Sequence, residues 1–219
     1  MSTAQSRMLV TSRVWLKVSN LRWIPGTVES VTDKSVTIAT EDGERVVVPR
    51  GSDRISQRTP RDLEAVDNLT MLPDLDEPNM LHSLCVRYMQ NKIYTRTGPI
   101  LVAMNPWTEL NVYGPDALHS YRRKKLDNVA PHVFAISETA FANLQANRKD
   151  QTILVSGDSG SGKTESTKRM LMYLAVRTCC VFGNQRHYGV QVHFRNRAKA
   201  ASPPGSCVLY GEGGRGKEG

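Results

Sequence analysis

Short runs of alternating apolar and polar residues, separated by turn residues, fill the first fifty positions of the chain. Val36 and Ile38 alternate with small or polar neighbours, and Glu-Asp-Gly-Glu at 41–44 is typical of a hairpin turn. The alternation predicts strands over residues 13–18, 23–31, 35–40 and 45–48. Short strands joined by tight turns favour a small β-barrel, which we expect over residues 11–50.

A barrel of this size is SH3-like, and two roles are open to it. Its rim could form a groove for a peptide partner, or the barrel could be a structural addition without a partner. No residue pattern in 11–50 favours the first role. The next segment, residues 51–78, is polar and irregular, and we expect it to be a connector.

After the connector, the apolar positions follow a helical period with strands between the helices. Leu81, Leu84, Cys85, Tyr88 and Met89 share one helical face. The later predicted elements are strands over residues 93–95, 100–104 and 152–156, and helices over residues 115–123, after Pro131 and after Thr164. Strands alternating with helices indicate a mixed α/β layer fold.

The two last helices are predicted from their apolar faces. The first face contains Val133, Ile136, Ala140, Phe141 and Leu144, and the second contains Met170, Leu171, Leu174 and Ala175. Both sets keep the i, i+3/i+4 spacing of one helix face.

Composition changes at the end of the chain. The net charge is +8, and residues 177–219 carry seven basic and two acidic residues together with half of the sixteen glycines. This segment has no sustained period, so we expect a disordered or aberrant tail. Basic charge without a recognition motif or a stacking pattern of aromatic residues does not indicate nucleic-acid binding, and we expect none.

The chain contains no signal for a membrane or for secretion. No run approaches the ~20 apolar residues of a membrane span, and the first residues lack the apolar stretch of a signal peptide. The four cysteines show no metal-ligand spacing. We expect reduced thiols and a cytoplasmic location.

Residues 157–164 read Gly-Asp-Ser-Gly-Ser-Gly-Lys-Thr, a complete G-x-x-x-x-G-K-T phosphate-binding loop, or P-loop. It lies between a predicted apolar strand and a predicted helix, so that its backbone N–H groups and the helix N-terminus can point at one anion. The predicted phosphate-binding residues are Gly157, Asp158, Ser159, Gly160, Ser161, Gly162, Lys163 and Thr164. The alternative, a glycine-rich turn that caps an ordinary helix, does not require Lys followed by Thr.

Each residue type in the loop has an expected role. Gly157, Gly160 and Gly162 allow a positive φ and a close approach of the backbone to phosphate. The Lys163 ammonium is expected between the β- and γ-phosphates. The Thr164 hydroxyl is expected to be a ligand of Mg²⁺, which prefers oxygen.

Together with the loop, several separated stretches resemble the N-terminal part of a myosin motor domain. Residues 157–170 are similar to the family's P-loop and its helix, which typically have Glu and Ala at the positions of Asp158 and Ser161. Residues 105–113, which begin Asn-Pro and end in Tyr, are similar to the adenine-side loop. Further matches are residues 72–84, residues 131–137 and the barrel, which resembles the SH3-like subdomain that precedes many myosin motors. The resemblance runs from about residue 11 to about residue 176.

This resemblance implies a partial P-loop NTPase unit over residues 79–176. It implies that Asn105, Pro106 and Tyr113 line an adenine pocket, with Tyr113 near the base. The implied cofactors are ATP and Mg²⁺, and the implied partner is actin. The implied location is the cytoskeleton, within a myosin complex.

Motifs that complete catalysis in the family do not occur in the chain. It contains neither the Asn-Ser-Ser-Arg of the first switch nor the Asp-x-x-Gly-Phe-Glu of the second, and it lacks the actin-binding cleft. We therefore assign no catalytic residue and expect hydrolysis near background for this chain alone. We also expect residues 100–104 and 153–155 to leave open sheet edges. A truncated or misassembled gene product would explain residues 177–219, with a genuine tail as the alternative.

Three functional hypotheses follow. The chain is the N-terminal fragment of an actin-based, ATP-hydrolysing motor, or it is a non-catalytic interaction module that acts through the barrel, or it is a P-loop kinase or NTPase unrelated to motors. The third would need an acidic metal-binding strand and lid arginines after the P-loop helix, and residues 177–219 show neither.

Overall fold

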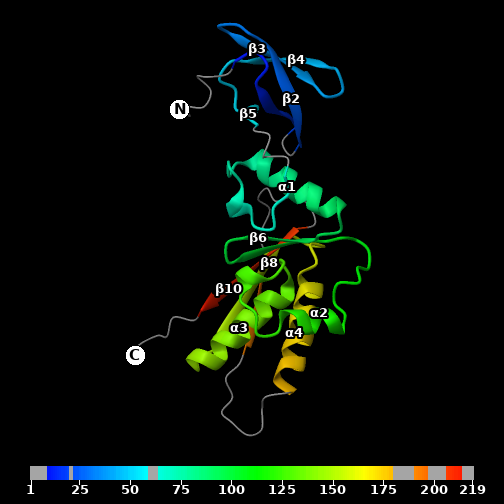
Figure 1. The fold of residues 1–219 in the computed structure, drawn as a ribbon, viewed down its shortest axis with the longest axis vertical. Helices are drawn as coiled ribbons and strands as arrows, with labels where there is room; N and C mark the ends of the chain where they lie inside the picture. The colour runs from blue at the N-terminus through cyan, green and yellow to red at the C-terminus, as the bar shows by residue number, and fades with distance from the viewer. Residues whose placement is uncertain (1–8, 20–21, 59–63, 180–189, 197–205, 214–219) are drawn as a thin grey trace. The chain divides into compact units, whose positions relative to one another are not determined.

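The computed structural model describes residues 9–19, 22–58, 64–179, 190–196 and 206–213, the last two ranges by their backbone alone. The chain divides into two compact units. One holds residues 1–65 and 72–84, and the other holds residues 66–71 and 85–219. Each unit contains one five-stranded sheet (Figure 1).

In the sheet of the first unit, hairpins join strands that are close in sequence. The strands are β1 (Arg13–Ser19), β2 (Arg22–Val31), β3 (Ser35–Thr40), β4 (Arg45–Pro49) and β5 (Ile55–Gln57), in the order β4-β3-β2-β1-β5. All pairings are antiparallel. The first four strands agree with the predicted strands to within one residue at each end. Their inward side chains form a core of Val14, Leu16, Val28, Val36, Ile38, Val48 and, from β5, Ile55.

The structure confirms the antiparallel strands of the predicted SH3-like barrel but shows no closed barrel, because this sheet is open in the part of the chain that the structure describes. β4 and β5 are its two edge strands, and no described pairing joins them. β5 has three residues, and all three pair with β1. β4 ends at Pro49, whose nitrogen has no hydrogen to donate to a further strand.

Helix α1 (Glu77–Met89) begins in the first unit, with Pro78 in its first turn as predicted. Two side-chain hydrogen bonds connect its start to the sheet. Trp15 Nε1 donates to Asn79 Oδ1 at 2.7 Å, and both residues are buried. Ser56 Oγ donates to Asp76 Oδ2 at 2.6 Å.

The sheet of the second unit is assembled from segments far apart in sequence. Its strands are β6 (Tyr94–Thr97), β7 (Ile100–Met104), β8 (Gln151–Gly157), β9 (Val190–Asn196) and β10 (Ser206–Gly213), in the order β6-β7-β10-β8-β9. β10, red in Figure 1, is antiparallel to both β7 and β8. β9 is parallel to β8.

The structure differs from the expected tail over residues 177–219 wherever it describes that segment. It places β9 and β10 there, and β10 pairs with the edges of β7 and β8 that we expected to be open. Pairing on both sides satisfies the backbone groups that such edges would expose. Residues 190–195 alternate between apolar and polar, which is typical of a strand. The prediction missed this strand because it relied on the glycine-rich composition of the whole segment 177–219. The rest of 180–219 lies outside the described residues.

The helical elements of the second unit are η3 (Leu69–Met71), α2 (Pro115–Tyr121), η4 (Leu126–Asn128), α3 (Val133–Asn147) and α4 (Lys163–Cys179). α3 packs against α4, and both helices contact β8. None of the helices in the described ranges has the length and apolar character that crossing a membrane requires.

The burial of residues in α3 and α4 can be compared with the apolar faces predicted for these helices. The whole predicted face of α3 is buried. In α4, Met170 and Leu174 are buried as predicted, whereas Leu171 is 51 % exposed and Ala175 is exposed. Tyr173 and Arg177 complete the inner face of α4 instead, because they follow Met170 at i+3 and i+7.

Candidate functional site

The predicted phosphate-binding segment forms a tight loop between the sheet and a helix. β8 ends at Gly157, and α4 begins at Lys163. Gly160 has φ +79° and Gly162 has φ +89°, which is the left-handed region that glycine adopts without strain. The expected positive φ is therefore confirmed at these two glycines. Gly157 does not show it, because it is the last residue of an extended strand.

The loop holds its lysine by its own carbonyl groups. Lys163 Nζ donates to the backbone oxygens of Gly157 at 3.0 Å and of Asp158 at 2.6 Å. The ammonium is thus positioned against the start of the loop. A phosphate bound here would meet a positive charge that is already oriented.

One side chain of the loop is buried without a hydrogen-bond partner. Ser161 is 2 % exposed, and its Oγ has no partner among the described residues. Buried hydroxyl groups are normally paired, so an unpaired one beside a cavity indicates a ligand or a water.

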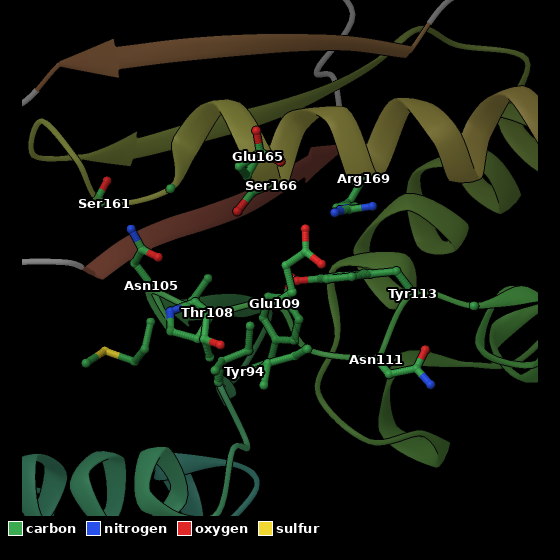
Figure 2. A pocket seen from close by; sticks show the side chains of 17 residues that line it. Tyr94, Asn105, Thr108, Glu109, Asn111, Tyr113, Ser161, Glu165, Ser166 and Arg169 are labelled. Carbon is green, nitrogen blue, oxygen red and sulfur yellow. The ribbon is translucent and has the colours of Figure 1, made fainter.

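A cavity of about 690 Å³ opens beside the loop (Figure 2). One wall comes from the end of β7 and the following segment, and it includes all three predicted adenine-side residues, Asn105, Pro106 and Tyr113. The other wall comes from the loop and the first turns of α4, and it includes Ser161 and Gly162. Two groups of residues predicted from separate stretches thus line the same cavity. The other predicted loop residues lie outside its lining.

The end of the cavity far from the loop is aromatic and cationic. The hydroxyls of Tyr94 and Tyr113 form a hydrogen bond of 2.8 Å. The Arg169 guanidinium lies 4.4 Å from the centre of the Tyr113 ring, a cation–π contact. Figure 2 shows Arg169 extending from α4 toward Tyr113, and the Glu109 carboxylate extending into the same space from the opposite wall.

Several of these lining residues were not predicted. Glu165, Ser166 and Arg169 lie on the cavity side of α4. A helix beginning at Lys163 places these positions on one face, so the helical period could have identified them. Tyr94 and Glu109 carried no comparable signal, because only the β6–β7 hairpin and the loop after it bring them to the cavity.

His132 packs against the two tyrosines at the aromatic end of the cavity. It caps the N-terminus of α3, where its Nδ1 accepts a hydrogen bond from Phe134 N at 3.1 Å. Its ring lies 4.9 Å from that of Tyr94 and 5.5 Å from that of Tyr113, between ring centres. Burial lowers its pKa to about 4, so the imidazole is neutral near pH 7. We therefore assign His132 a structural role.

The far end of α4 is fixed to α3 by a buried ion pair. Arg177 donates to Glu138 twice, from Nε at 2.6 Å and from Nη2 at 2.9 Å. Tyr173 Oη and Arg123 N donate to the same carboxylate, each at 2.8 Å. Burial raises the pKa of Glu138, but these donors, Arg177 foremost, outweigh it and hold the pKa below its usual value. The helix that carries the loop is thus anchored at its other end.

Comparison with known proteins decides the family. The family model described as "Myosin head (motor domain)" matches residues 66–189 of the chain. The chain belongs to the myosin head family. The predicted resemblance is thereby confirmed, and the matched span extends past residue 176, where we had expected it to end.

Individual myosins give the same result. "Myosin-J heavy chain" of Dictyostelium discoideum is 43% identical over 165 residues, which cover 74% of this chain and 7% of that protein. "Myosin-2" of Arabidopsis thaliana is 38% identical over 164 residues, covering 74% of this chain and 13% of that protein. "Myosin-11" of the same plant is 38% identical over 173 residues, covering 77% and 11%. The chain thus spans a small part of the length of the myosins that it matches.

Proposed function

We propose that the cavity beside the loop binds ATP with Mg²⁺, and that the chain is the N-terminal nucleotide-binding part of an actin-based motor. One observation carries this proposal. Ser161 and Gly162 of the P-loop line one cavity with residues of the segment 105–113, although the two segments lie far apart in sequence.

The phosphate end offers the donors that a triphosphate needs. The first N–H groups of α4 have no partner within the helix and are suited to an anion. The oriented Lys163 ammonium adds a positive charge. The unpaired Ser161 hydroxyl adds a further group that a phosphate oxygen could engage.

Magnesium would have one protein ligand in the described part of the chain. That ligand is the hydroxyl of Thr164, an exposed residue in the first turn of α4. Within the described ranges, no group of three His, Cys, Asp or Glu side chains could hold a metal ion. Mg²⁺ commonly keeps several waters and shares phosphate oxygens, so a single hydroxyl is compatible with its chemistry.

The aromatic end would hold the purine. Tyr113 and Tyr94 offer ring surface and hydroxyls, and Glu109 offers a carboxylate that could accept from an exocyclic amine. A purine that stacks on Tyr113 would share the ring with Arg169 or displace it. Asn105 and Pro106 complete this wall.

Hydrolysis and movement are proposed for the whole motor and not for this chain alone. Phosphoryl transfer depends on positioning the attacking water and on completing the coordination of the metal. The residues named above supply the phosphate side of that arrangement. Because the chain spans 7% to 14% of its relatives, we attribute ATP hydrolysis, actin binding and a cytoskeletal location to the longer protein.

Equilibrium titration with a fluorescent ATP analogue and Mg²⁺ tests the binding proposal. Lys163→Ala should weaken binding at least tenfold, because it removes the oriented ammonium. Lys149→Ala is the control, since Lys149 is an exposed lysine just before β8 that does not line the cavity. Identical curves for the unaltered protein and Lys163→Ala would overturn the proposal.

A further inference from the structure

Asn105 connects the end of β7 to the phosphate loop through both ends of its side-chain amide. Its Nδ2 donates to the backbone oxygen of Gly160 at 2.8 Å. Its Oδ1 accepts from Trp107 N at 3.1 Å. The two partners fix the orientation of the amide, because a carbonyl requires a donor and an N–H requires an acceptor.

The surroundings of Asn105 hold it in this position. Its backbone oxygen accepts a hydrogen bond from Tyr88 Oη at 3.2 Å. A Cβ built on Gly162 would lie 3.9 Å from Cβ and Cγ of Asn105, which is van der Waals distance. A Cβ on Gly160 would similarly lie 3.7 Å from the Trp107 ring. Asn105 and Trp107 are thus the side chains beside the two left-handed glycines, with room for about one carbon atom between them.

Within the loop itself, the described hydrogen bonds do not hold the carbonyl of Gly160, which is held by the Asn105 side chain. Ser161 N donates to Asp158 O at 3.3 Å, and the lysine holds the carbonyls of 157 and 158. The bond from Asn105, the residue after β7, is the described contact that holds the carbonyl of Gly160 from a segment 55 residues away in sequence. It acts on the Gly160–Ser161 peptide, which follows a glycine with positive φ, where the backbone has most freedom.

We propose that Asn105 is a positioning residue for the phosphate loop and not a reader of the purine. The resemblance to the family assigns Asn105 to the adenine side, whereas the described hydrogen bonds of its side-chain amide go to the backbone of Gly160 and of Trp107. The expected effect of Asn105 on nucleotide affinity rests on the proposed function. Its expected effect on the order of the loop does not, because the hydrogen bond to Gly160 is present without a ligand.

The test compares Asn105→Ala with Asn111→Ala. Asn111 lines the same cavity on the same segment but has no described bond to the loop, so it is a matched control. Asn105→Asp is a second variant of nearly the same shape, which keeps the acceptor for Trp107 N and loses the donor to Gly160 O. Hydrogen exchange of the backbone amides 158–162 is measured in the ligand-free chain, and binding is measured for MgATP and for magnesium tripolyphosphate, which has no base.

We expect both Asn105 variants to accelerate exchange in the loop and Asn111→Ala to leave it unchanged. Loss of about one hydrogen bond should weaken MgATP about 3- to 10-fold. Because the loop contacts phosphate, Asn105→Ala should weaken tripolyphosphate by the same factor. Tyr113→Phe, at the aromatic end, should weaken MgATP and leave tripolyphosphate unchanged.

Two results would overturn the inference. The first is unchanged loop exchange in both Asn105 variants. The second is a loss of MgATP affinity in Asn105→Ala with unchanged affinity for tripolyphosphate, which would make Asn105 a reader of the base. If the unaltered chain binds neither ligand, the proposed function fails, and the exchange measurement still decides the role of Asn105.

Discussion

The two sheets of this protein hold the same number of strands and are built in opposite ways. In the first unit, most pairings join strands that follow one another along the chain. In the second unit, β10 lies between β7 and β8, which precede it by about 100 and 50 residues. The candidate nucleotide site lies at the ends of β7 and β8. The site therefore depends on long-range pairing, whereas the first sheet depends mainly on local hairpins.

The largest expected difference comes from a proline in each sheet. Leu209→Pro breaks the ladder of β10, whose residue 209 pairs with Leu101 on one side and Val155 on the other. The substitution should be strongly destabilising, because a central strand loses a ladder hydrogen bond and does not accommodate proline. We expect loss of nucleotide binding and fast hydrogen exchange across β7 and β8, with normal protection in β1–β3.

Val47→Pro is the control for that substitution. Val47 lies on the edge strand β4 and pairs only with Thr37. We expect a local effect on β4 and unchanged nucleotide binding. Unchanged protection of β7 in Leu209→Pro would show that the second sheet does not depend on β10, and loss of nucleotide binding in Val47→Pro would contradict the contrast between the two sheets.

A second contrast compares the two bidentate ion pairs of the molecule's described part. Glu138→Gln leaves the buried guanidinium of Arg177 without a counter-charge, which typically costs ~3–5 kcal/mol. Glu29→Gln removes the partner of Arg45 on the exposed face of the first sheet, where water replaces the interaction, and we expect no measurable change. Denaturant unfolding of both variants measures the difference. A similar free energy of unfolding for the two would contradict the burial argument.

His132 predicts a pH dependence for the second unit alone. Its pKa of about 4 lies below the ordinary 6.5, so the unfolded chain binds more protons between these values. The unfolding free energy should therefore fall by ~3 kcal/mol as the pH falls from 6.5 to 4. His132→Asn can still cap α3 but cannot titrate, so it should flatten this decline. The same slope in both proteins would refute the assignment, and segment-resolved hydrogen exchange should show no such decline in β1–β3.

The smallest expected effect concerns the first unit. Asn79→Ala leaves the buried Trp15 Nε1 without an acceptor, which should cost ~1–3 kcal/mol. Combining it with Trp15→Phe removes both polar groups, so the second substitution should cost less in the Asn79→Ala background than in the unaltered protein. Thermal unfolding followed by circular dichroism measures this double-mutant cycle. Strictly additive costs would mean that the hydrogen bond contributes nothing.

The difference between the sheets also explains what the sequence could predict. The first four strands of the first unit and the strand before the P-loop were predicted almost to the residue, because alternation is a local signal, whereas β5 lies in the predicted connector. The open edges of the first sheet and the position of β10 between β7 and β8 were not predicted, because pairing between strands distant in sequence produces no local sequence pattern. In the site, the motif identified the loop and the resemblance identified segment 105–113. The bridge from Asn105 to Gly160 and the contact of Arg169 with Tyr113 depend on tertiary geometry alone.

The buried bidentate ion pair between Arg177 and Glu138 has a mechanical consequence for the loop at the other end of α4. Arg177 lies fourteen positions after Lys163 on α4, which corresponds to roughly 20 Å of helix. A shift of α4 along its axis would separate the charges of Arg177 and Glu138, which are buried from water. If the loop changes shape when a ligand binds in the cavity, we therefore expect the backbone to rotate at Gly160 and Gly162 while α4 keeps its position.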